Sequence, residues 1–167
     1  MATNLEFIKS ASADNVSSLT VTDIFSANYD VYEVFIRGNG SQNVGSLSAE
    51  FLDSGGSDIG QSNYDYAILR MHPFEAFSNV NGTNGNSFEF AYTGSSDKDF
   101  GAKITVFNPF SSSSYTFANI QSMSITGEKA IVVATVTTSA VSMKFYANQN
   151  YTPVDVSVYG VKQWVVA

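Results

Sequence analysis

The chain has 167 residues, no cysteine and a net charge of −7, with 15 acidic residues against 8 basic ones. This length suits one domain whose core needs no cross-links, and the lack of cysteine excludes disulfides and thiolate metal sites. Nucleic acids are bound by clustered cations, so an acidic chain without a basic run is not expected to bind them.

Strands are predicted along the whole chain, because apolar and polar residues alternate with a period of two. The segment 31–37 is the clearest: Tyr32, Val34 and Ile36 share one face, and Glu33 and Arg37 share the other with Val31 and Phe35. The predicted strands are 5–9, 17–22, 31–37, 47–51, 64–71, 88–92, 100–106, 115–125, 130–136, 141–147 and 154–159.

The segment 72–86, HPFEAFSNVNGTNGN, is the longest stretch without strand alternation. Its proline and its two Asn-Gly pairs favour turns, so we expect a long loop at about 72–86. Loops of this length often contact a partner.

The last two strands are expected to form a pair joined by a short turn at 148–153, where Asn148-Gln149-Asn150 and Pro153 favour reversal. The alternation of the second strand breaks at Gly160, since Val161 falls on the face opposite to Val158. A β-bulge at Gly160 is the simplest explanation.

About ten short strands at regular spacing, with no helical period and no linker, predict an all-β protein. We expect a single-domain jelly-roll β-sandwich of roughly ten short antiparallel strands that covers residues 1–167. No segment is apolar over a membrane-spanning length, and MATNLEFIKSASADN lacks the cationic and apolar stretches of a secretory signal. We therefore expect no membrane partner and synthesis in the cytoplasm.

Candidate catalytic and metal sites are weak. His72 is the only histidine, and it has no Gly-x-Ser-x-Gly motif to accompany it, so a hydrogen-bonded loop histidine is expected. Aspartates near predicted loops, at 53, 58, 65, 97 and 99, show no spacing that singles out a glycosidase pair. Calcium at Asp53–Asp58 or Asp97–Asp99 is the alternative to ordinary turn-forming aspartates. We expect no catalytic residues, no metal, no cofactor and no enzymatic activity.

Aromatic side chains on outward strand faces or in loops are the best candidates for contact with a partner or ligand. A ring brings a large apolar surface, and Tyr and Trp add a polar group. The alternative is that most of these rings lie in the core or form cross-strand pairs. The candidate contact residues are Phe74, Phe77, Tyr64, Tyr146 and Trp164.

Short motifs along the chain resemble those of small jelly-roll virion structural proteins of tailed bacteriophages, especially phages of marine bacteria and cyanobacteria. The motifs are YDVYEV at 29–34, YDY at 64–66, VFNP at 106–109, KFYAN at 144–148 and VYGVK at 158–162. The resemblance covers about residues 5–162 and implies a virion location. In that family the domain serves as a capsid decoration (cement) protein, as a knob on the virion or as the tip of a tail fibre.

Two roles follow from this resemblance. The first is a capsid decoration protein that binds the major capsid protein or other virion proteins, as a homo-oligomer and preferably a trimer. The second is a receptor-binding tip module of a tail fibre that recognises a host-surface glycan. Because the first predicted strand begins within a few residues of Met1, a free-standing decoration protein is the favoured expectation. Decoration predicts a flat apolar patch, whereas glycan recognition predicts an aromatic platform ringed by Asn, Asp and Gln.

Overall fold

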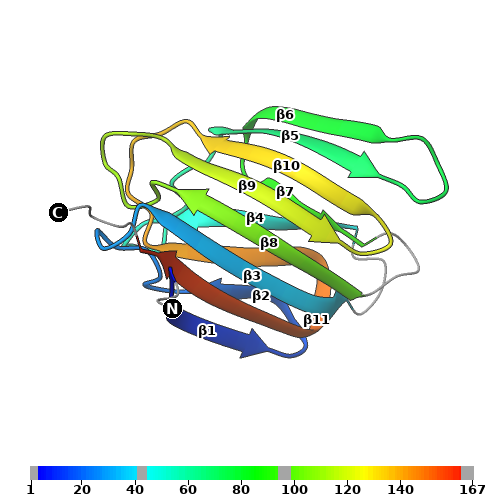
Figure 1. Cartoon of the computed structure of the whole chain (residues 1–167), viewed down its shortest axis with the longest axis horizontal. Coiled ribbons are helices and arrows are strands. Elements are labelled where there is room, and N and C mark those ends of the chain that lie inside the picture. Colours follow the sequence, from blue (N-terminus) through cyan, green and yellow to red (C-terminus); the bar gives the residue numbers. More distant parts are fainter. Residues whose placement is uncertain (1–3, 41–44, 94–98, 163–167) are drawn as a thin grey trace.

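The computed structural model describes residues 4–40, 45–93 and 99–162, which form antiparallel strands (Figure 1). Over these ranges there is no helix that could cross a membrane. The strands are β1 (Leu5–Ala13), β2 (Val16–Val21), β3 (Val31–Gly40), β4 (Ser46–Leu52), β5 (Tyr64–Met71), β6 (Ser78–Gly85), β7 (Phe88–Tyr92), β8 (Asp99–Phe107), β9 (Thr116–Met123), β10 (Gly127–Ala134) and β11 (Ser142–Val161).

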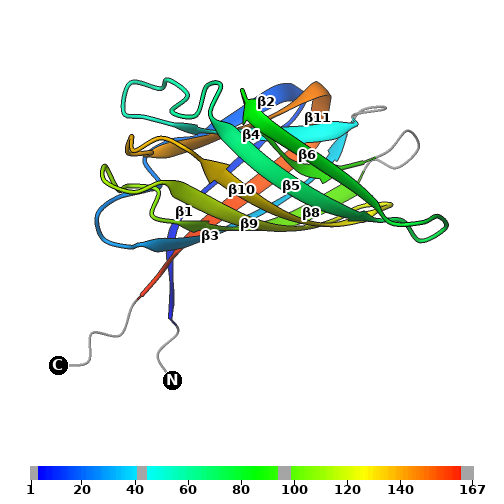
Figure 2. The same cartoon turned by 90° about the horizontal axis from the view of Figure 1, so that it is seen from above.

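The strands form two layers, which Figure 2 shows from the side. The large sheet has the order β1-β11-β3-β8-β9-β10-β5-β6, and the small sheet has the order β2-β11-β4-β7. Between successive strands the chain crosses repeatedly from one layer to the other, and the apolar faces of both sheets pack together in between. The predicted all-β sandwich of roughly ten antiparallel strands is thereby confirmed.

Strand β11 belongs to both layers and corrects the predicted hairpin at 141–159. Residues Met143–Tyr146 pair with β2 and β4, and Val154–Gly160 pair with β1 and β3. The register shifts around Tyr151, where the chain bends instead of reversing. The bend lets Phe145 and Val156, one from each half, face the same core.

Gly160 is not the site of a bulge, contrary to the prediction. The alternation of buried and half-buried residues continues through Gly160 to Val161, and the irregularity lies in the neighbouring strand, between Phe7 and Lys9. An added Cβ at Gly160 would lie 2.6 Å from carbons of the Tyr29 ring. The glycine therefore leaves room for Tyr29 to cover this end of β11.

Much of the predicted loop at 72–86 is an edge strand, and only 72–77 connects β5 to β6. The strand SNVNGTNG has the composition of a loop, but its backbone pairs with β5. Val80 lies opposite the buried Ile68, and the Tyr66 ring covers Gly82, where an added Cβ would lie 2.6 Å from it. Pairing and this ring contact outweigh the weak strand propensity.

Aromatic rings fill the centre of the core. Phe51 of β4 and Phe88 of β7 lie in the small sheet, and Tyr64 of β5 joins them from the large sheet; all three are fully buried. The ring centroids of Phe51 and Phe88 are 5.2 Å apart, and those of Tyr64 and Phe88 are 5.4 Å apart. The Tyr64 hydroxyl donates to Asp58 Oδ1 at 2.7 Å and accepts the Phe51 N–H at 2.8 Å, so this polar group is satisfied.

A charged cluster links the two layers. Arg70 of β5 pairs with Glu89 of β7 and, at 2.5 Å, with Glu128 of β10. The side chain of Glu128 is only 2% exposed and also accepts the Ser122 hydroxyl at 3.2 Å. The Arg70 guanidinium carbon lies 4.2 Å from the centroid of the Tyr92 ring. Two carboxylates thus share one cation in a largely buried site.

This cluster predicts a dependence of stability on pH. Burial, and then the nearby Glu128 carboxylate, raise the pKa of Glu89 above its ordinary value of 4.5. Between 4.5 and the raised pKa the folded state holds a proton that the unfolded chain has lost. The free energy of unfolding should therefore fall as the pH rises through this window.

The Glu89→Gln variant tests this expectation, because glutamine keeps the shape of a protonated glutamate at every pH. Urea denaturation of both proteins across the window should show the wild type losing stability relative to the variant as the pH rises. A wild type that instead gains stability relative to the variant would mean that the charge of Arg70 outweighs burial.

Candidate functional site

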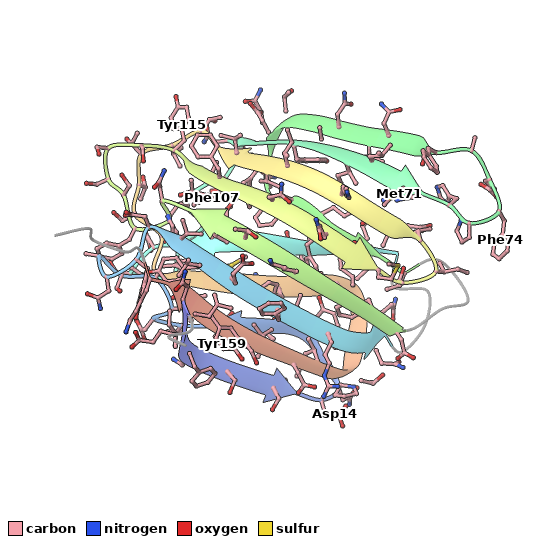
Figure 3. The ribbon with its side chains drawn as sticks, in the orientation of Figure 1. Asp14, Met71, Phe74, Phe107, Tyr115 and Tyr159 are labelled. Carbon is pink, nitrogen blue, oxygen red and sulfur yellow. The ribbon has the colours of Figure 1, made fainter. Side chains whose placement is uncertain are left out.

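The four predicted contact residues that the structure describes do not form one site. Tyr64 is fully buried between the layers, so it cannot meet a partner directly. Phe74 and Phe77 are 87% and 68% exposed in the β5–β6 connection, and Figure 3 shows Phe74 at the far end of the molecule. Trp164 lies outside the described residues.

Tyr146 is half-buried on the outer side of the small sheet, where it lies opposite Ser48 and Ser18. The Lys144 ammonium lies 5.0 Å from the centroid of its ring, and burial raises the pKa of Tyr146 to about 12. This side of the small sheet is separated by the core from the outer side of the large sheet. Tyr146 therefore does not extend any contact surface formed there.

The described residues that were considered as candidate catalytic or metal-binding groups take part in local hydrogen bonds. His72 Nε2 lies 3.1 Å from the Ser78 hydroxyl oxygen, as expected for a loop histidine. Asp53 Oδ1 accepts the N–H groups of Gly55 and Ser57, which makes it a turn-forming residue. Asp99 Oδ1 accepts Asn39 Nδ2–H at 2.7 Å, whereas Asp97 lies outside the described ranges. Within those ranges no group of three or more His, Cys, Asp or Glu could hold a metal ion.

The outer face of the large sheet, which points away from the small sheet, carries a run of aromatic rings. Phe7 of β1, Tyr159 of β11 and Phe35 of β3 follow one another across three neighbouring strands. The ring centroid of Tyr159 lies 5.6 Å from that of Phe7 and 5.8 Å from that of Phe35, both edge to face. Figure 3 marks Tyr159 on the side that faces the viewer. Phe35 remains 40% exposed at the end of this run.

Beside Phe35 the outer face is hollowed by a depression of about 530 Å³. Its floor is Gly101 of β8, which lies between Arg37 of β3 and Met123 of β9. An added Cβ at Gly101 would meet no atom within 4 Å, so the missing side chain leaves the hollow open. Phe35 and Lys103 form one side of the depression, and Gln121 also lines it.

Two further depressions continue this hollow towards the sheet edge. One, of about 490 Å³, shares Gln121 with the first and is lined by residues of β9, β10, β5 and β6. Another, of about 610 Å³, shares Ala67, Asn81 and Ile131 with the second. The three depressions lie side by side across the sheet from β3 to β6, and we call them together the track. At roughly 4.8 Å per strand, it is about 24 Å long.

Side chains along this track are mainly amides, cations and apolar groups. The amide side chains are Asn79, Asn81, Asn119 and Gln121. The cations are Arg37, Lys103 and Lys129. Between them lie Met123 and Ile131, which are 68% and 60% exposed. An open surface of this kind offers hydrogen-bond donors and acceptors next to apolar contacts on a rigid sheet.

The few carboxylates on the track already have partners. Asp155 Oδ2 accepts from both Nε and Nη2 of Arg37, each at 3.1 Å. Asp65 Oδ1, in the depression nearest the edge, accepts the Asn84 N–H at 3.0 Å. Two free carboxylates facing each other, as glycoside hydrolysis requires, are not found along the described track.

An exposed apolar patch lies on the same face of the large sheet, at the ends of the strands that are opposite to the Gly101 depression. Phe107 of β8 and Phe117 of β9 are a cross-strand pair, with Val31 and Val133 on either side. Tyr115, just before β9, is 44% exposed and lies at the same end of the sheet (Figure 3). We call Phe107, Phe117 and Tyr115 the aromatic end patch.

Part of the outer face of the large sheet could be predicted from the sequence. The alternation at 31–37 correctly puts Phe35 and Arg37 on the side opposite to Tyr32, Val34 and Ile36. It did not suggest that Gly101 lies beside Arg37, because that neighbour comes from a strand about sixty residues away. The outward direction of Met123 and Ile131 was also missed, since apolar residues in strands usually point to the core.

Comparison with known proteins leaves the family open: no family model and no curated protein matches the chain. Similar solved structures include exo-inulinase from Aspergillus awamori (TM-score 0.45, 10% identity, 96% of this chain and 29% of that chain). Alginate lyase Aly36B gives a TM-score of 0.36 at 10% identity, over 93% of this chain and 81% of that one. A tail fiber protein from an E. coli phage gives 0.31 at 10% identity, over 98% and 22%. Similarities this low assign no function.

Proposed function

We propose that this protein is a virion structural protein of a tailed bacteriophage that binds a carbohydrate, without catalysis, through the outer face of its large sheet. The resemblance of its motifs to phage jelly-roll proteins supports the virion setting. The observation that carries the binding role is the track of three neighbouring depressions from β3 to β6, with an aromatic ring, amides and cations along it.

The track has the properties that a sugar polymer requires. Phe35 offers an exposed ring for the apolar face of a sugar, and the amides of Asn119 and Gln121 can both donate to and accept from hydroxyl groups. Because these side chains stand on paired strands, the backbone positions from which they project are fixed before the ligand arrives. The track is open at its surface, which suits a chain of several sugar rings better than one small enclosed ligand.

Binding without reaction is favoured by the state of the carboxylates. Asp155 of β11 and Asp65 of β5 line different depressions with four strands between them, so they do not face each other as a pair of catalytic carboxylates. A receptor-binding role at a tail-fibre tip, with a host-surface glycan as the ligand, agrees with these features.

The aromatic end patch favours a second candidate function, capsid decoration. Phe107 and Phe117 are 37% and 41% exposed on a flat sheet face, and exposed aromatic clusters of this kind are typical of protein–protein contacts. In this role the patch would bind the major capsid protein or a neighbouring copy in a closed trimer.

One experiment separates the two functions. The purified protein is tested by affinity electrophoresis against soluble polysaccharides and by cosedimentation and electron microscopy against heads that lack it. Carbohydrate recognition predicts retardation in at least one polysaccharide gel, reduced by Phe35→Ala and unchanged by Phe117→Ala. Regular binding over the capsid lattice, lost in Phe117→Ala and without any retardation, would overturn carbohydrate recognition in favour of decoration.

A further inference from the structure

Three of the eight basic residues of this acidic protein lie on the first two depressions of the track, counted from β3. Arg37, Lys103 and Lys129 come from β3, β8 and β10, and all three point outward on the same face. Lys103 and Lys129 stand directly on either side of Gln121 in the strand register. The chain as a whole carries a net charge of −7, so this grouping runs against its overall charge.

These cations remain available to a ligand although two of them have partners. The Arg37 side chain is 80% exposed while it holds Asp155. Lys103 is 45% exposed, whereas its partner Glu33 is 13% exposed and is also held by the Thr105 hydroxyl. Lys129 is exposed and forms no ion pair with a residue that the structure describes. The side chains of Arg37 and Lys103 are thus more exposed than the carboxylates with which they pair.

The depression at Gly101 brings an apolar contact next to these charges. Phe35, which lies opposite Lys103 in the register, supplies a ring at its side, and Gly101 leaves its floor free of a side chain. A ring-shaped ligand seated on the floor would therefore have the Phe35 ring on one side and a cation within reach. Carboxylates form stronger hydrogen bonds with ammonium and guanidinium groups than neutral hydroxyls do.

We propose that the track binds an acidic polysaccharide, with a carboxylate-bearing sugar seated in the Gly101 depression beside Phe35 and the cations Arg37 and Lys103, and with Lys129 as a further cation in the adjoining depression. This inference rests on the proposed carbohydrate binding and adds the chemical class of the ligand and the place of the charged sugar. Asp65 lines the third depression without a cation among the described lining residues, whereas Asp155 in the Gly101 depression is accompanied by Arg37 and Lys103. The charged sugar is therefore assigned to the Gly101 end of the track and not to the β6 end.

The test compares polygalacturonate with its fully methyl-esterified form, in which each carboxylate is replaced by an uncharged methyl ester, and uses hyaluronate as a second acidic polymer. Dissociation constants are measured by affinity electrophoresis at low and at moderate salt. The variants are Lys103→Gln/Lys129→Gln, which removes charge, and Gly101→Leu, which fills the depression where an added Cβ meets no neighbour. Lys162→Gln, which replaces an exposed lysine paired with Glu6 of β1, is the control.

We expect the wild type and the control to bind an acidic polymer at least about tenfold more tightly than the ester, with weaker binding at higher salt. The double lysine variant should lose about tenfold for the acidic polymers and nothing for the ester, and Gly101→Leu should weaken both.

Three other outcomes would each overturn a defined part of the proposal. Equal binding of the ester, unaffected by the lysine variant, overturns the acidic class and leaves the carbohydrate function standing. Acidic binding that Gly101→Leu does not change overturns the placement in the depression. No retardation by any of the three polymers, with circular dichroism showing a folded protein, overturns the inference; the wider polysaccharide set described above then decides the proposed function separately.

Discussion

Replacement of Arg70 by alanine is expected to destabilise the protein by about 3–5 kcal/mol, because it leaves two carboxylates without their cation in a largely buried site. Glu128 is 2% exposed and Glu89 is 12% exposed, so water can replace little of the lost interaction. The contact between the guanidinium and the Tyr92 ring is lost at the same time. Urea denaturation followed by circular dichroism at neutral pH measures the effect.

Two comparisons make this prediction specific. Lys162→Ala breaks an exposed ion pair with Glu6 and should change the free energy of unfolding by less than about 1 kcal/mol. The triple variant Arg70→Met/Glu89→Leu/Glu128→Leu removes the three charges together and should be less destabilised than Arg70→Ala. An Arg70→Ala variant as stable as Lys162→Ala would mean that the cluster does not hold the layers together.

Replacement of Phe51 by alanine should also cost about 3–5 kcal/mol, through the lost burial of the ring and the cavity left between the sheets. Phe51 is fully buried, and its ring centroid lies 5.2 Å from that of Phe88 and 6.2 Å from that of Tyr64. These rings are held by both layers, so the surrounding structure has little freedom to collapse into the space. Equilibrium denaturation provides the measurement.

Phe117→Ala is the matched control for this second prediction, since it removes the same ring from a side chain that is 41% exposed. Its cost should stay below about 1 kcal/mol. Similar losses for the two variants would show that the aromatic end patch is as important to the fold as the core, and would contradict its assignment as a surface available to a partner.

The predicted strands were most accurate where one face is buried throughout. The segments 64–71 and 88–92 match β5 and β7, and the alternation of Tyr32, Val34 and Ile36 correctly identified the core side of β3. In such strands the local pattern and the final environment agree. The same agreement makes the all-β class readable from the sequence alone.

Errors arose where long-range pairing decides the structure. The residues of β6 look like a loop because their strand character comes from β5, and β11 looks like a hairpin because its bend carries turn-forming residues. The cluster of Arg70, Glu89 and Glu128 was equally hidden, since charged residues in strands are normally expected at the surface. None of these features has a signal within a short window of sequence.

The candidate site shows the same limit. Phe35 and Arg37 were placed on the correct face, but the depression is formed by a glycine on the next strand and by Gln121 on the strand after it. Tyr64 was selected because its ring was predicted to point outward, but it is a core residue. A binding surface on a sheet is a property of several strands in register, and the sequence of one strand does not contain it.

Strand β11 also sets the order in which the protein can fold during synthesis. It pairs with β1, β2, β3 and β4, which precede it by roughly a hundred residues or more, and so neither sheet can close until the ribosome has made β11. Earlier strands must wait with open edges, which favours slow folding and exposes them to association with other chains. The eleven strands are therefore expected to fold as one cooperative unit, and only after β11 has been made.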